Sequence, residues 1–190
     1  MANPNQAFGL RPSRSLGRSN TQVNEYAHPS SDGTALFIGD AVVTTGDSVS
    51  AVPPYIDGTP YVIASGTITT TAIRGAVCGV RPTLTNLTLQ YCPASTALGI
   101  LVADDPYQLF DIMDDGTAAS GDVSGNIAIT AAAGSTVTGL SAYVAHEASL
   151  GSTNVLRIIR MAPIVNNVLG ANAVLECAVN AHELKSTSGT

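Results

Sequence analysis

Four residues near the middle of the chain have the spacing of a calcium-binding loop. Positions one, five, six and twelve of the EF-hand pattern are filled by Asp111, Asp115, Gly116 and Asp122. Position three, however, is Met113, and position twelve is aspartate where the pattern requires glutamate. The flanking residues have the character of strands, whereas an EF-hand lies between helices. We therefore expect a hydrated turn here, and we expect no metal ion or cofactor in the protein.

Acidic pairs at 104–105 and 114–115 supply the residue type that glycoside hydrolysis requires. Neighbouring residues at a strand end point to opposite faces, however, and the chain has no Trp and only 5 % aromatic residues to line a sugar cleft. The histidines are too scattered for a His-x-x-x-His metal pair, and no Gly-x-Ser-x-Gly elbow or phosphate-binding glycine loop is present. We expect no catalytic residues, and hence a protein that is not an enzyme.

The composition indicates which partners to expect. Charged residues make up 12 % of the chain, against about 25 % in an ordinary soluble domain. A low charge suits a protein packed against copies of itself or a large partner, because buried charges would have to lose their water. The net charge of −6 argues against nucleic acid as a partner. No apolar run approaches the roughly 20 residues of a membrane-spanning helix, so we expect no membrane association.

The three cysteines form no paired spacing, and no secretory signal pattern opens the chain. We expect Cys78, Cys92 and Cys177 to be free thiols in a protein made in the reducing cytoplasm of a host cell.

The elements that would position these residues are short strands. Turn signals recur at short intervals, and β-branched or aromatic runs lie between them, whereas helical periodicity is nowhere sustained. The sequence therefore predicts an all-β fold, either a β-sandwich of the jelly-roll type or a small β-barrel. We expect one β-rich domain at 21–185, an extended N-terminal arm at 1–20 and a flexible tail at 186–190. Strands are predicted at 35–38, 41–45, 73–80, 86–91, 98–103, 127–130, 137–140, 142–146, 155–161 and 173–182, with a hairpin at 61–72.

The segment 104–116 is predicted to be a turn, a strand and a second turn. Its strand carries apolar side chains on both faces, so it belongs between two layers or between a sheet and a neighbouring subunit. We assign self-association to this strand, through Leu109, Phe110, Ile112 and Met113.

The first 20 residues show no periodicity and contain two prolines and three arginines. Such a segment is either a disordered terminus or an arm that becomes ordered on a partner. In the second case, the apolar contacts would be Phe8 and Leu10, and the charged contacts would be Arg11, Arg14 and Arg18.

Four segments carry a family resemblance. They are the opening MANPNQAFGLRP, the central DDPYQLFDIMDDG at 104–116, GANAVLE at 170–176 and NAHEL at 180–184. In these segments the chain resembles the capsid decoration (cement) proteins of tailed bacteriophages. The resemblance implies a β-rich protein on the outer surface of the virion capsid, which bridges neighbouring major capsid proteins and stabilises the shell. It also implies a homo-oligomer, a trimer more than a dimer, without an active site.

On this interpretation, the arm residues named above would contact the capsid. Deleting residues 1–20 would then weaken shell binding and leave the fold intact. The alternative is a β-sandwich adhesion or carbohydrate-binding module on the virion surface, for which the six tyrosines are the available sugar platforms.

Overall fold

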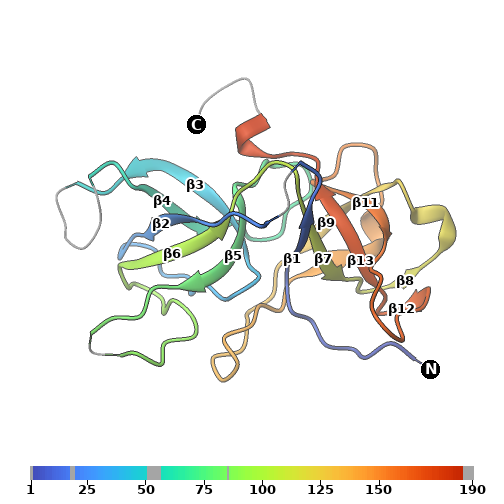
Figure 1. The fold of residues 1–190 in the computed structure, drawn as a ribbon, viewed down its shortest axis with the longest axis horizontal. Helices are drawn as coiled ribbons and strands as arrows, with labels where there is room; N and C mark the ends of the chain where they lie inside the picture. The colour runs from blue at the N-terminus through green and yellow to red at the C-terminus, as the bar shows by residue number, and fades with distance from the viewer. Residues whose placement is uncertain (1, 18–19, 51–56, 85, 186–190) are drawn as a thin grey trace.

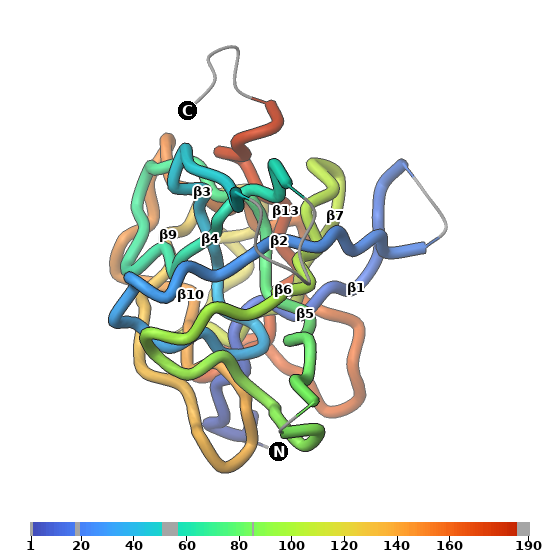
Figure 2. The backbone as a smooth tube through the Cα atoms, turned by 90° about the vertical axis from the view of Figure 1, so that its left-hand side faces the viewer, coloured from blue at the N-terminus to red at the C-terminus, as the bar shows by residue number. Residues whose placement is uncertain are grey.

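The computed structural model describes residues 2–17, 20–50, 57–84 and 86–185 as a β-barrel beside a β-sheet (Figure 1). The barrel is closed by five strands in the order β2-β4-β3-β5-β6. Their bounds are β2 Asn24–His28, β3 Ala41–Ser48, β4 Pro60–Ala64, β5 Gly75–Val80 and β6 Leu98–Ala103. Viewed from the barrel side, these strands lie in front of the sheet (Figure 2).

The sheet has six strands in the order β1-β7-β13-β11-β9-β10, and every neighbouring pair is antiparallel. Its strands are β1 Arg11–Ser15, β7 Gln108–Met113, β9 Asn126–Thr130, β10 Val144–His146, β11 Leu156–Met161 and β13 Val174–Val179. A small ribbon pairs β8 (Thr117–Ala118) with β12 (Gly170–Ala171). The described residues also contain three 3-10 helices: η1 Ser120–Asp122, η2 Glu147–Ser149 and η3 Glu183–Lys185. The predicted all-β class is confirmed.

Two apolar clusters hold these parts together. One fills the barrel, and its buried side chains include Tyr26, Val62 and Ile100. The other lies between barrel and sheet, since it joins Ile73 and Ala76 of the barrel side to sheet residues such as Phe110. Burial of this continuous apolar surface stabilises the two parts against each other.

Strand β7 lies inside the molecule. All six of its residues are buried, and it is hydrogen-bonded to β1 on one side and to β13 on the other. The self-association assigned to Leu109, Phe110, Ile112 and Met113 is therefore wrong for the folded chain, because these side chains are at most 3 % exposed. Apolar side chains on both faces indicated a strand between two layers, and both layers belong to the same chain.

The N-terminal segment is part of the fold and is not an extended arm. Residues 11–15 form β1, and the Leu10 side chain is fully buried in the cluster between barrel and sheet. Leu10 N–H donates to the Gly39 carbonyl at 2.8 Å. This approach requires glycine, because a Cβ on Gly9 would lie 2.3 Å from the Gly39 oxygen, and both glycines have positive φ.

Several short runs predicted as strands are irregular in the structure. Residues 35–38, 86–91 and 137–140 make only isolated bridges, and the 61–72 hairpin is absent. The reason for the missing hairpin is that β4 already pairs with β2 and β3. Beyond Gly66 the chain instead crosses to the sheet, where Ile68 bridges to Ile129. The predicted tail at 186–190 lies outside the described residues.

Candidate functional site

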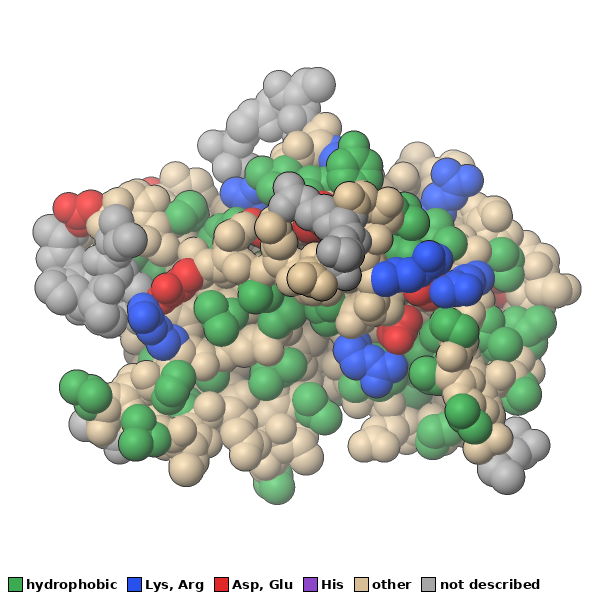
Figure 3. All heavy atoms as spheres, in the orientation of Figure 1, with side chains coloured by type: hydrophobic (Ala, Val, Ile, Leu, Met, Phe, Trp, Pro, Cys, Tyr) green, Lys and Arg blue, Asp and Glu red, His purple; other side chains and the backbone are tan. Residues whose placement is uncertain are grey.

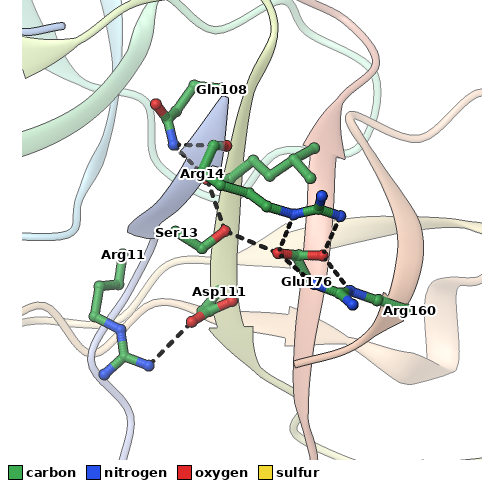
Figure 4. Close-up of polar contacts among 8 residues, drawn as sticks. Arg11, Ser13, Arg14, Gln108, Asp111, Arg160 and Glu176 are labelled. Atoms are coloured by element: carbon green, nitrogen blue, oxygen red, sulfur yellow. Dashed lines mark hydrogen bonds and ion pairs between the residues drawn. The ribbon is translucent and has the colours of Figure 1, made fainter. Parts of the chain in front are cut away.

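Four strands of the sheet carry a row of charged residues on one face. The strand registers place Arg11 opposite Asp111, Asp111 opposite Glu176, and Glu176 opposite Arg160. We call Arg11, Asp111, Glu176 and Arg160 the charge row (Figure 4). Two carboxylates directly opposite each other repel, so the arginines at both ends are needed to balance them.

Glu176 is the centre of this arrangement. Arg14 binds its carboxylate with both Nε and Nη2, each at 3.1 Å, while Arg160 Nε donates to Oε2 at 2.6 Å. Ser13 Oγ lies 3.2 Å from Oε1 (Figure 4). Burial alone would raise the pKa of Glu176, but the hydrogen bonds from the two arginines outweigh it and lower the pKa to about 2. The charge row, together with Ser13 and Arg14, thus attaches β1 to its neighbours in the sheet.

In the structure, the described residues among those predicted to contact a capsid make contacts within the chain instead. Leu10 is buried, Arg11 pairs with Asp111 at 3.1 Å, and Arg14 pairs with Glu176. Phe8 is half-buried, with the Arg11 guanidinium 4.8 Å from its ring centroid. Arg18 lies outside the described residues. Leu10 is therefore excluded as an exposed contact, and Arg11 and Arg14 are engaged within the chain.

The residues with calcium-loop spacing are not brought together. Asp111 belongs to the charge row, whereas Asp115 accepts hydrogen bonds from His146 Nδ1 at 2.7 Å and from the Glu147 N–H at 3.0 Å. Asp122 accepts the Ala119 N–H at 2.6 Å. As placed, no three His, Cys, Asp or Glu side chains in the described part of the chain converge as metal ligands.

Few of the described tyrosines expose a ring on which a sugar could stack. Tyr26 and Tyr143 are buried, Tyr91 stacks on Phe37 with ring centroids 5.1 Å apart, and Tyr107 is the one more than half exposed in the described chain. Cys78, Cys92 and Cys177 are free thiols, as predicted.

Three loops project from one end of the molecule, the lower end in Figures 1 and 2. We call them the loop rim: residues 81–84 with 86–91, residues 131–140, and residues 162–169. Hydrophobic side chains are visible along this edge in the space-filling view (Figure 3). The most exposed apolar side chains of the rim are Leu84 (99 %), Leu87 (74 %), Val137 (83 %) and Val165 (91 %). Only one charged residue, Arg81, occurs in these segments, and it pairs with Glu25.

Contacts at their bases fix the rim loops. A Cβ on Gly139 would lie 2.5 Å from the Gln90 carbonyl oxygen, so the first two loops touch. The third loop is held by Asn3, which donates to the Val168 and Ala171 carbonyls and accepts the Val168 N–H at 3.0 Å. The N-terminal segment thus positions one rim loop. Sequence reasoning missed the rim, although the scarcity of charge in these segments was a visible signal.

No protein-family model matches this chain, and neither curated proteins nor solved structures show significant similarity to it. Among the described residues, no helix has the length and apolar character needed to cross a membrane.

A buried carboxylate beside the second rim loop gives a pH-dependent prediction. Asp40 is 2 % exposed and accepts the Phe37 N–H at 2.8 Å, and burial raises its pKa to about 6. An acid whose pKa is raised on folding stabilises the fold below its unfolded pKa, and this contribution is lost as the pH rises through about 6. We expect Asp40→Asn to increase the free energy of unfolding by about 2 kcal/mol at pH 7.5 and to change it little at pH 4.

Urea denaturation at the two pH values measures this effect, with Asp47→Asn, an exposed carboxylate on β3, as the control. A variant that is less stable than the wild type at pH 7.5, or equally changed at both pH values, contradicts the prediction.

Proposed function

We propose that this protein decorates the outer surface of a tailed-bacteriophage capsid, where it bridges neighbouring major capsid proteins. The observation that carries the proposal is the loop rim, whose exposed apolar tips and near absence of charge resemble the core of a protein interface. Three tips at one end of the molecule are able to meet a single broad surface together. The sequence resemblance to decoration proteins supplies the identity of that surface.

The capsid contact then lies at the loop rim and not at the N-terminal segment, where Leu10 is buried. The N-terminal segment keeps an indirect role, because Asn3 fixes the third rim loop. Homo-oligomerisation, as a trimer more than a dimer, stays part of the proposal. It must use a surface other than the buried strand β7.

The rim assignment predicts the effect of charging its tips. We expect the combined variant Leu84→Asp, Val137→Asp and Val165→Asp to bind expanded, undecorated heads at least about 100-fold more weakly than the wild type. Each apolar side chain buried in an interface contributes about 1.5–3 kcal/mol, and 1.4 kcal/mol corresponds to a tenfold change in affinity. Co-sedimentation with heads built from the cognate major capsid protein measures the binding.

The matched control is Leu184→Asp in η3, which is half exposed at the opposite end of the molecule (Figure 1). This variant should bind as the wild type does. Wild-type protein that fails to bind heads saturably would overturn the decoration function. Wild-type binding by the triple variant would overturn only the assignment to the rim.

A further inference from the structure

A roomy pocket lies against the second rim loop, 131–140. Its volume is about 570 Å³, within the range of about 300–1,000 Å³ that is typical of ligand sites. Most of its surface is apolar, and the apolar lining comes from segments far apart in the sequence: Ala35, Phe37, Ala64, residues 131–133 and Tyr143. Such walls favour an apolar chain, because burying it against them removes apolar surface from water.

The walls of this pocket are held in place by contacts within the chain. Ile38 N–H donates to the Gly139 carbonyl at 2.9 Å, and Ser141 N–H donates to the Ile38 carbonyl at 2.8 Å. A Cβ on Gly134 would clash with the Phe37 ring, so the rim loop lies directly on that ring. The pocket is therefore already formed in the folded chain, as ligand sites usually are.

Asp40 is the one charged residue among the described residues of the lining. Its exposure of 2 % places it at the base of the pocket, whereas Gly33 and Thr34 of the same lining are exposed. Asp40 Oδ2 accepts the Phe37 N–H at 2.8 Å, and the Ser141 side chain also favours the ionised form by hydrogen bonding. Oδ1 has no hydrogen-bond partner of normal geometry in the described chain. Both donors are neutral, so the negative charge is left unbalanced.

No positive charge of the described lining balances Asp40. The lining contains no Lys, Arg or His among its described residues. At pH 7.5 the carboxylate is ionised, because burial raises its pKa only to about 6. A buried charge without an opposite charge lowers the stability of a fold. A positively charged ligand in the pocket offsets this cost.

The hydrogen bonding of the carboxylate selects the kind of cation. A guanidinium binds a carboxylate best through two parallel hydrogen bonds to both oxygens. The Phe37 N–H already occupies Asp40 Oδ2, however, and a compact ammonium needs only Oδ1. The apolar walls suit the four-carbon stem of a lysine, whose methylenes pack on apolar surface while the charge reaches a polar group.

We propose that this pocket, with Asp40 at its base, binds the side chain of a lysine on the capsid surface. Thr136 of the lining adjoins Val137, one of the apolar tips of the rim, so the two contacts are continuous. The capsid as the source of the lysine rests on the proposed function, whereas the chemistry of the pocket does not. The rim then supplies apolar contact, and Asp40 selects a surface with a lysine at the matching position.

Calorimetric titration of the full chain at pH 7.5 with N-α-acetyl-lysine methylamide tests the chemistry. We expect saturable binding of one molecule per chain with a Kd of about 1 mM, which is the order reached by ligands of this size. The matched ligand is N-α-acetyl-norleucine methylamide, which lacks only the amine. It should bind at least about tenfold more weakly, because it forms no charge-assisted hydrogen bond.

Asp40→Asn should weaken the binding of the lysine derivative at least about tenfold. This variant is expected to be more stable than the wild type at pH 7.5, so unfolding could not explain the loss. Asp47→Asn on β3 should bind the derivative as the wild type does. The proposal is overturned by a wild type that shows no saturable binding, by equal binding of the two ligands, or by equal binding of the lysine derivative to Asp40→Asn and the wild type.

Co-sedimentation with expanded, undecorated heads identifies the source of the lysine. Asp40→Asn should bind the heads about tenfold more weakly than the wild type. If this variant loses the lysine derivative and still binds heads as the wild type does, the assignment of the lysine to the capsid is wrong and the pocket binds a free amine. A wild type that binds the lysine derivative but no heads overturns the decoration function, and with it the capsid as the source, while the pocket keeps its ligand class.

Discussion

Deleting residues 2–17 is expected to leave the protein largely unfolded at 25 °C. The deletion removes Leu10 from the cluster between barrel and sheet. Truncating a fully buried leucine to alanine alone costs about 2–5 kcal/mol. The deletion also exposes the edge of β7. Because β7 is an apolar strand that is otherwise buried, its exposed edge would be prone to pair with other chains.

The deletion also lowers the stability of the fold electrostatically. Asp111 and Glu176 lie opposite each other, and without Arg11 and Arg14 only Arg160 remains to balance them. Leaving a buried acceptor without its hydrogen-bond partner costs about 1–3 kcal/mol. Together with the loss of Leu10, this approaches the total stability of about 5–15 kcal/mol that is typical of a native domain.

Circular dichroism and urea denaturation measure the outcome, and the control is a shorter deletion of residues 2–8. The shorter deletion retains Leu10 and β1 but removes Asn3, so it should loosen the third rim loop and leave cooperative unfolding. A 2–17 deletion that unfolds with the wild-type midpoint would show that the segment is a dispensable arm.

The long strands could be predicted from the sequence because the residues that mark them lie within the strands and in the turns beside them. Residues 98–103 and 155–161 are continuous apolar or alternating runs bounded by turn residues, and they correspond to β6 and β11. The acidic and proline residues at 104–106 likewise marked the turn between β6 and β7. The all-β class follows from such runs without knowledge of their pairing.

The place of the N-terminal segment could not be predicted, since nothing within it shows a periodicity. Strand β1 forms because it pairs with the edge of β7. The β1 residues Arg11 and Arg14 bind carboxylates about 100 and 160 residues away in the sequence. Alternation along β13 places Glu176 on the face opposite to Leu175 and Cys177. It could not show that Arg14 and Arg160 would cover Glu176 and bury it.

The calcium-loop spacing at 111–122 shows the same limit of local patterns. The spacing selected Asp111, which pairs with Arg11, and Asp115, which accepts hydrogen bonds from His146 Nδ1 and the Glu147 N–H. A site assembled by tertiary contacts carries no fixed spacing in the sequence.

Glu176→Gln is expected to lower the free energy of unfolding by about 3 kcal/mol at pH 7. Folding lowers the pKa of Glu176 from 4.5 to about 2, because the hydrogen bonds from Arg14 and Arg160 overcome the effect of burial. At about 1.4 kcal/mol per pH unit, this difference gives the expected loss. Glutamine keeps the shape of the side chain but cannot accept both arginines. The arginines themselves are about half exposed and stay hydrated, so no further buried charge is left unpaired.

The pH dependence distinguishes this loss from a packing defect. A carboxylate whose pKa is lowered on folding stabilises the protein fully above its unfolded pKa of 4.5, and the stabilisation disappears as the pH falls to about 2. The gap between wild type and Glu176→Gln, measured by urea denaturation, should therefore shrink over that interval. Glu25→Gln, in the exposed pair with Arg81, is the matched control and should cost less than about 1 kcal/mol. A gap that stays constant from pH 7 to pH 2.5 would mean that the shape of Glu176, and not its charge, holds β1 to the sheet.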